Sequence, residues 1–156
     1  MPFQAFLSHS SRDEHLVGRT RDHVEAAGIQ LYLAEHDPHP GLALSQKIQR
    51  AIDDSHVVVL LLTPNSYDSA YVNQEVGYAL RAGKLVVPLV DPSVPPGALA
   101  MLDGVEYIPL QDGSEDAMTL LTEELKHRAD KLDRVEVWVA VAVIAALMLV
   151  LIAAAE

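Results

Sequence analysis

The sequence predicts an α/β domain, a five-stranded parallel sheet with helices on both faces, followed by one C-terminal transmembrane helix. Short aliphatic runs alternate with amphipathic stretches along the first 134 residues, which is the pattern of parallel strands joined by helices. His56–Leu62 contains six consecutive aliphatic residues, as expected for a strand buried on both faces. Residues 137–155 are 19 consecutive apolar positions, so a separate hydrophobic helix follows the domain.

The five predicted strands are short runs of apolar residues bounded by turn-forming residues. In chain order they are Phe3–Ser8, Ile29–Leu33, His56–Leu62, Leu85–Val90 and Val105–Pro109. Pro88 lies inside the fourth run, and because proline lacks a backbone N–H it favours an edge position for that strand.

The helices are predicted from apolar residues at helical spacing and from residues that cap helix ends. Ser11 and Glu14 form a capping box before the first helix, and Gly28 is expected to end it. The N-caps predicted for the second, third and last helices are Ser45, Ser66 and Ser114. Glu35–Leu44 contains two prolines and a glycine and is predicted to be a loop.

The apolar run at 137–155 is predicted to span a membrane. A helix of this length rises about 28 Å, close to the ~30 Å hydrocarbon core of a bilayer. The run has no polar stripe, and Trp138 stands at its start, where aromatic anchors are common. The expected division of the chain is therefore a domain at 1–127, a juxtamembrane helix at 128–136 and a transmembrane helix at 137–155.

The charges that flank the apolar run predict its orientation. Lys126, Arg128, Lys131 and Arg134 precede it, and only Glu156 follows. Because cytoplasmic flanks carry an excess of Lys and Arg, we expect a single-pass protein anchored in a lipid bilayer by its C-terminal helix, with the N-terminal domain in the cytoplasm.

Composition excludes several functions. The net charge is −11 and no basic stripe is present, which argues against nucleic-acid binding because phosphates need clustered cations. The chain has no cysteine, so it has no disulfides, thiolate metal site or cysteine nucleophile. The phosphate-binding and dinucleotide-binding glycine motifs are absent. His36 and His39 share a loop but lack obvious further ligands, so we expect no metal site.

Polar residues gather where the carboxyl ends of the strands should lie, which is where open parallel sheets bind ligands. Ser8, His9 and Ser10 stand between the first strand and a helix, where free backbone N–H groups attract anions. Glu75 borders the buried stripe of the third helix. It is either a partly desolvated carboxylate facing a cleft or an inert, solvent-exposed helix residue.

Three segments resemble motifs of bacterial and archaeal Toll/interleukin-receptor (TIR) domains, and the resemblance covers about residues 3–127. Residues 6–13 (FLSHSSRD) resemble the first strand and turn, and residues 36–41 (HDPHPG) resemble the loop after the second strand. Residues 69–75 (SAYVNQE) resemble the Ser-x-Trp-x-x-x-Glu helix of NAD-cleaving members. His36 replaces the usual arginine and Tyr71 the usual tryptophan.

The resemblance implies a flavodoxin-like sheet, TIR–TIR self-association and, as in many prokaryotic members, NAD+ hydrolysis or cyclisation in signalling or antiphage defence. NAD+ would be a substrate, with no bound cofactor. Glu75 matches the catalytic glutamate, and Tyr71 could stack on a base while Ser8, His9 and Ser10 contact the diphosphate or a ribose. Asp37, Pro40 and Gly41 would shape a loop that packs against a neighbouring domain.

Cleavage of the nicotinamide–ribose bond needs stabilisation of positive charge on the sugar, which one fixed carboxylate can supply. The preferred hypothesis is therefore an NAD+ nucleosidase that acts on self-assembly, with either ADP-ribose or a cyclised isomer as product. A non-catalytic adaptor that recruits other TIR proteins is the main alternative. A nucleoside deoxyribosyltransferase-like enzyme is a third, since it shares the sheet topology and a carboxylate chemistry.

Overall fold

The computed structural model describes residues 3–33, 44–111 and 115–153. All five strands pair in parallel, in the order β2-β1-β3-β4-β5. Their bounds are β1 Gln4–Ser8, β2 Gln30–Leu33, β3 Val57–Leu62, β4 Leu85–Val90 and β5 Ile108–Pro109. The predicted five-stranded parallel sheet is confirmed, and its strand order is that of doubly wound flavodoxin-like folds.

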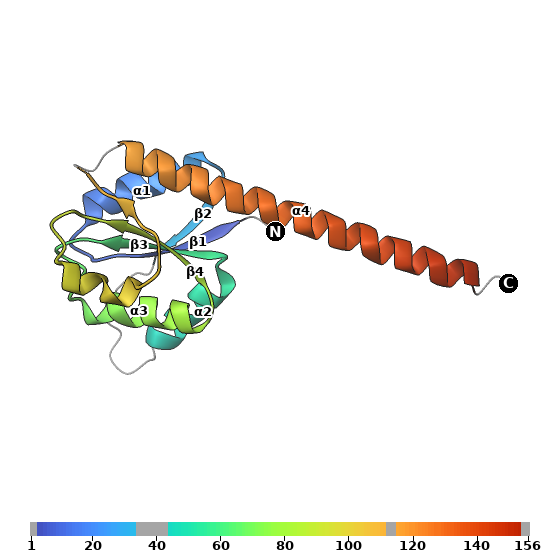
Figure 1. The fold of residues 1–156 in the computed structure, drawn as a ribbon, viewed down its shortest axis with the longest axis horizontal. Helices are drawn as coiled ribbons and strands as arrows, with labels where there is room; N and C mark the ends of the chain where they lie inside the picture. Colours follow the sequence, from blue (N-terminus) through green and yellow to red (C-terminus); the bar gives the residue numbers. More distant parts are fainter. Residues whose placement is uncertain (1–2, 34–43, 112–114, 154–156) are drawn as a thin grey trace. The chain divides into compact units, whose positions relative to one another are not determined.

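Four α-helices and one 3-10 helix are present among the described residues. They are α1 Glu14–Ala26, α2 Leu44–Asp54, α3 Ala70–Arg81, η1 Pro96–Leu102 and α4 Glu115–Ala153. Figure 1 shows α2 and α3 on one face of the sheet and α1, with the first turns of α4, on the other. Each strand connects to the next through a helical segment, as parallel pairing requires.

The core is built around β3, whose six residues are all fully buried. Alternate residues of a strand point to opposite faces. Val58 and Leu60 therefore pack with Phe6 of β1 against α2 and α3, in a cluster that includes Ile52 and Val76. The continuous aliphatic run of the sequence reflects this burial on both faces.

Pro88 does not place β4 at the sheet edge, because β4 pairs with β3 on one side and β5 on the other. Val90 accepts a hydrogen bond from Leu110 on the β5 side. Peptide groups alternate in direction along a strand, so Pro88 faces that same side. The ladder with β5 begins only at Leu89, so the missing N–H of proline interrupts no strand pairing.

Three of the predicted helix caps are wrong. Helix α2 begins at Leu44, so Ser45 lies inside that helix and not at its N-cap. Helix α1 begins at Glu14 with Asp13 at the N-cap, so Ser11 lies in a turn before it. Helix α3 is capped by Ser69, which accepts from Val72 N, whereas Ser66 is buried and donates to the carbonyl of Leu61. Serines in neighbouring turns compete for such backbone groups, and tertiary burial decides which one caps.

Of the other two cap assignments, one is confirmed and one lies outside the described residues. Gly28 follows α1 with φ +79°, a left-handed conformation that glycine adopts freely, as predicted for a helix end. Ser114 and residues 35–43 of the predicted loop lie outside the described part of the chain, whereas Leu44, the last residue of that predicted loop, is the first residue of α2.

The chain divides into two compact units, residues 1–122 and residues 123–156, and α4 contributes to both. Among the described residues, no helix is long and apolar enough to cross a membrane. The predicted transmembrane helix is therefore not supported.

The side chains of residues 149–155 lie outside the described part of the chain. The boundaries drawn at residues 127 and 136, and the cytoplasmic location of the domain, stay predictions.

The buried face of α4 provides a direct test of the core. Leu121 is fully buried, whereas the adjacent Leu120 is 51 % exposed. We expect Leu121→Ala to lower the free energy of unfolding by about 2–5 kcal/mol, since it removes apolar contacts and leaves a cavity. Leu120→Ala is the matched control and should cost less than about 1 kcal/mol. Urea denaturation followed by circular dichroism measures both, and equal losses would contradict this packing.

A polar cluster joins α1 to the start of α4. Glu115 accepts from Arg19 Nη2 at 2.8 Å and lies 2.9 Å from Nε2 of His23, whose Nδ1 lies 2.8 Å from the Arg19 carbonyl. The backbone carbonyl of Arg19 and then the Glu115 carboxylate raise the pKa of His23 above 6.5. The hydrogen bonds from His23 and then Arg19 lower the pKa of Glu115 below 4.5.

These opposite pKa shifts predict a pH window of extra stability. The contribution of His23 is complete below 6.5 and is lost as the pH rises through its raised pKa, whereas that of Glu115 is lost as the pH falls through its lowered pKa. We expect His23→Gln to lower Tm more at about pH 5.5 than at about pH 8.5. His15→Gln, at an exposed position of the same helix, is the control. A pH-independent difference would exclude the pairing.

Candidate active site

The end of β1 and the first turns of α3 bring a serine and a glutamate together. Ser8 lies two residues after Phe6 on β1, so its side chain faces the same side of the sheet, toward α3. Glu75 lies one turn after Val72 and one turn before Ala79, both of which are fully buried. The periods of the strand and of the helix therefore direct the two side chains toward each other.

Ser8 and Glu75 form a short hydrogen bond inside the protein. Ser8 Oγ donates to Glu75 Oε2 at 2.5 Å, although 67 positions separate the two residues in sequence. Ser8 is fully buried and Glu75 is 3 % exposed. The interpretation of Glu75 as a solvent-exposed surface residue is therefore wrong, and its carboxylate is held in a defined orientation.

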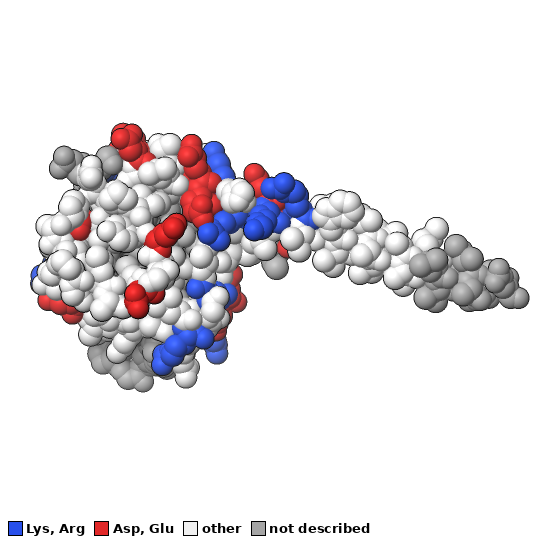
Figure 2. Space-filling model, viewed as in Figure 1, with Lys and Arg blue, Asp and Glu red and all other residues white. Residues whose placement is uncertain are grey.

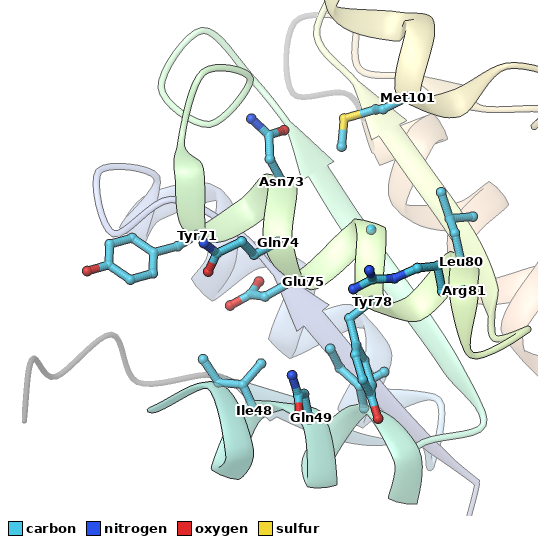
Figure 3. A pocket seen from close by; sticks show the side chains of 12 residues that line it. Ile48, Gln49, Tyr71, Asn73, Gln74, Glu75, Tyr78, Leu80, Arg81 and Met101 are labelled. Atoms are coloured by element: carbon cyan, nitrogen blue, oxygen red, sulfur yellow. The ribbon is translucent and has the colours of Figure 1, made fainter. Parts of the chain in front are cut away.

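Glu75 also lines a cavity of about 850 Å³ that lies along α3. Figure 3 shows its carboxylate directed toward Ile48 and Gln49 of α2. Apolar and polar side chains share the lining, which suits an organic ligand with several polar groups. The polar residues are Gln49, Tyr71, Asn73, Gln74, Tyr78 and Arg81.

A second polar contact fixes α2 against α3 beside this cavity. Tyr78 Oη lies 2.9 Å from both carboxylate oxygens of Asp53, and this hydrogen bond is the main reason that the pKa of Tyr78 is raised. Lys84 Nζ donates to the backbone carbonyls of Asp53 and Ser55 at 2.5 and 2.8 Å. The end of α2 is thus tied to α3 and to the residue that precedes β4.

The turn between β1 and α1 is held by bonds to the loop after β3. Thr63 Oγ1 and Asn65 Nδ2 donate to the two carboxylate oxygens of Asp13 at 2.7 and 2.6 Å. His9 is 9 % exposed and Ser10 is 8 % exposed, and Ser10 Oγ accepts from Arg12 N. Asp13 therefore joins two strand-end loops at the carboxyl edge of the sheet.

The structure places some of the predicted site residues together and leaves others outside its described part. Ser8 and Glu75 are joined directly, and His9 and Ser10 follow Ser8 in the chain. Tyr71 lines the same cavity but is 55 % exposed, and Figure 3 shows its ring directed away from Glu75. The loop residues Asp37, Pro40 and Gly41, and the substituted His36, lie outside the described residues. The substrate contacts of all these residues stay predictions.

Gln49 and Arg81 are among the cavity residues that sequence reasoning missed. Both lie on helix surfaces, where a polar residue is ordinary, and only the pairing of α2 with α3 brings them to one cavity. The polar clamp formed by Asp53 and Tyr78 was missed for the same reason. Within the described ranges, no group of three or more His, Asp or Glu residues could hold a metal ion.

Comparison with known proteins identifies the domain. The family model described as "TIR domain" matches residues 5–123, most of the chain. The chain belongs to the TIR-domain family. A curated relative, the probable 2′ cyclic ADP-D-ribose synthase BdTIR of Brachypodium distachyon, is 27 % identical over 112 residues. That match covers 69 % of this chain and 50 % of BdTIR. The chain therefore spans about half the length of this relative.

Solved structures show the same fold at low sequence identity. The TIR domains of the activated Roq1 resistosome superpose with a TM-score of 0.63 at 16 % identity, over 79 % of the chain and 99 % of theirs. The TIR domain of the Toll-related receptor TRR-2 from Hydra magnipapillata superposes with a TM-score of 0.62 at 15 % sequence identity. The match covers 78 % of the chain and 97 % of the TRR-2 domain. The CMP N-glycosidase BcmB of Clostridium botulinum superposes with a TM-score of 0.58 at 16 % sequence identity. The match covers 75 % of the chain and 97 % of BcmB.

The hydrogen bond between Ser8 and Glu75 predicts energetic coupling between two residues far apart in sequence. In a double-mutant cycle, Ser8→Ala and Glu75→Ala should couple by about 1 kcal/mol or more in the free energy of unfolding, because neither alanine can form the bond. Ser8→Ala combined with Gln74→Ala is the matched cycle, because Gln74 adjoins Glu75 and has no hydrogen bond to Ser8. Urea denaturation provides the four free energies of each cycle. Additive effects in the first cycle would show that the bond does not form in solution.

Proposed function

We propose that this TIR protein cleaves the bond between nicotinamide and ribose of NAD+, with Glu75 as the catalytic carboxylate. The observation that carries the proposal is the position of Glu75, which is buried, hydrogen-bonded to Ser8 and part of the cavity lining. The sequence likeness to BdTIR, a probable synthase of a cyclic ADP-ribose, supports it.

Cleavage of the nicotinamide–ribose bond requires a fixed negative charge beside the ribose. Nicotinamide leaves as a neutral molecule from a positively charged ring nitrogen, so the reaction needs little acid catalysis. Positive charge develops on the sugar, and a carboxylate that is already oriented stabilises it without reorganisation. Ser8 supplies the orientation by holding Oε2 of Glu75.

The cavity offers groups that fit the rest of the dinucleotide. Its volume of about 850 Å³ lies within the range of small-molecule sites. Arg81 brings a guanidinium that can pair with a phosphate, and the amides of Gln49 and Gln74 can bond ribose hydroxyls. Asp13, through Thr63 and Asn65, holds the nearby strand-end loops in place.

We further propose that the activity depends on self-association of the domains and serves signalling or defence. The fold shared with TIR domains of an activated resistosome supports association between domains. The product is ADP-ribose or a cyclised isomer, according to whether water or a nitrogen of the adenine reaches the anomeric carbon.

Nicotinamide release tests the proposal. Wild-type protein incubated with NAD+, alone and on a clustering support, should release nicotinamide, and Glu75→Gln should reduce the rate by about 100-fold or more because it removes the stabilising charge. Glu25→Gln, an exposed carboxylate on α1, is the matched control and should retain the wild-type rate. Chromatography of the products distinguishes ADP-ribose from a cyclised isomer.

Two other outcomes would identify the alternatives. A wild type that is inert under every clustering condition, but still binds other TIR domains, would be an adaptor. Base exchange on deoxyribonucleosides without NAD+ cleavage would indicate a deoxyribosyltransferase-like enzyme, whose chemistry is close to that named for the structurally similar CMP N-glycosidase.

A further inference from the structure

The N-cap residue of α1 does not cap its helix with its side chain. Asp13 occupies the N-cap position, where an aspartate ordinarily accepts a hydrogen bond from one of the first backbone N–H groups of the helix. The side chain of Asp13 makes no such bond. Because a side-chain cap stabilises a helix, this local departure indicates that the carboxylate of Asp13 serves another part of the structure.

Both carboxylate oxygens of Asp13 bind the loop after β3 instead. Thr63 Oγ1 donates to Oδ2 at 2.7 Å, and Asn65 Nδ2 donates to Oδ1 at 2.6 Å. Thr63 Oγ1 also accepts from the backbone N–H of Asn65 at 3.1 Å, so the two donors are fixed relative to each other. Hydrogen bonds to a charged carboxylate are stronger than those between neutral groups. We call these three residues the Asp13 bridge.

On one side, the Asp13 bridge holds the turn that follows Ser8. Asp13 N donates to the carbonyl of Ser10 at 3.0 Å, and Ser10 Oγ accepts from Arg12 N at 3.3 Å. At the start of the turn, Ser8 is held in the sheet by the pairing of β1 with β3, where its partner is Leu60. The short segment from Ser8 to Asp13 is therefore fixed at both of its ends.

On the other side, a series of hydrogen bonds leads from the Asp13 bridge to helix α3. Ser66 Oγ accepts from Thr63 N at 2.8 Å, and the carbonyl of Ser66 accepts from Ser69 N at 3.0 Å. Ser69 is the N-cap of α3, and its Oγ accepts from Val72 N. Glu75 lies less than one turn after Val72, so the position of this loop determines where the carboxylate of Glu75 lies.

The Asp13 bridge and the bond between Ser8 and Glu75 therefore connect the same two segments of the chain. Ser8 Oγ donates to Glu75 Oε2 at 2.5 Å in the interior, whereas Asn65 of the bridge is exposed. Two separate connections restrict the relative movement of the segments more than one does. No residue of the bridge is among the described residues that line the cavity. Any effect of the bridge on a ligand in that cavity is therefore transmitted through Ser8 and Glu75.

We propose that Asp13 is a positioning residue that keeps the carboxylate of Glu75 oriented for catalysis. This inference rests on the proposed cleavage of NAD+. The bond from Ser8 holds Glu75 directly, and the Asp13 bridge keeps the two segments at the distance that this bond requires. Without the bridge the cavity still accepts the substrate, but a displaced carboxylate stabilises the charge on the ribose poorly. Loss of the bridge should therefore lower kcat and leave KM nearly unchanged.

Exchange of donor and acceptor within the Asp13 bridge tests this role in the full chain. Asn65→Asp sets two carboxylates against each other, and the addition of Asp13→Asn restores an amide–carboxylate bond in the reverse direction. In assays of nicotinamide release from NAD+, Asn65→Asp should lower kcat by about 10-fold or more while KM stays within about 3-fold. The double variant should regain most of the wild-type kcat. All assays are run well below the Tm of each variant, so that every protein is folded.

Two control variants separate positioning from changes in charge or stability. Figure 2 shows several acidic side chains on the visible face of the domain, and Gln30→Glu adds one more at an exposed position, at the amino end of β2. Leu121→Ala weakens the core at a fully buried position of α4. Both should retain the wild-type kcat. If Asn65→Asp also retains it, or if the double variant regains the wild-type Tm but not the kcat, the proposal is wrong.

A measurement without NAD+ separates this inference from the proposed function. The double-mutant cycle of Ser8→Ala and Glu75→Ala is repeated in the Asn65→Asp background. The coupling in the free energy of unfolding should fall to less than half of its value in the wild-type background. If the wild-type protein releases no nicotinamide, the proposed function fails, and this coupling still decides whether the Asp13 bridge positions Glu75. An unchanged coupling overturns the inference whatever the activity.

Discussion

The complete burial of β3 is the constraint on which the rest of the domain depends. Six aliphatic side chains without solvent exposure require cover on both faces of the sheet. Parallel neighbours make each connection cross over the sheet, and the connecting helices provide that cover. The same geometry collects the carboxyl ends of β1 and β3 at one edge, and helix α3 packs on the face of the sheet next to it. The place of Ser8 and Glu75 is thus a consequence of how the central strand is buried.

The sequence was sufficient for the features that repeat with a period. Alternation and helical spacing predicted five parallel strands and their helices. They placed Glu75 at the border of a buried stripe and left open whether its side chain is buried. Single-residue signals were less reliable, because their outcome depends on neighbours distant in sequence. Ser11 and Ser66 look like helix caps, but Asp13 and Ser69 occupy those positions. Pro88 suggested that β4 is an edge strand. The pairing of β4 with β5 begins only at Leu89, so the proline fits in an inner strand.

Some residues of the candidate site could be predicted from the sequence, and others could not. Motif resemblance and periodicity predicted Ser8 and Glu75, and the structure adds the hydrogen bond that joins them. Gln49 and Arg81 could not be predicted, since a polar residue on an amphipathic helix carries no signal of which helix will pack beside it. Buried carboxylates are costly unless they are hydrogen-bonded, and Ser8 supplies such a bond to Glu75.

The shortness of β5 has a consequence for the way copies of the chain can meet. A sheet edge with free N–H and C=O groups can recruit a strand from another molecule. β5 pairs with β4 over only two residues, one of which is Pro109, and proline has no N–H to offer. This edge is therefore a poor template for sheet extension, which would otherwise add copies without limit. A partner that meets this end of the sheet would therefore have to contact side chains, whereas β2 forms the opposite edge.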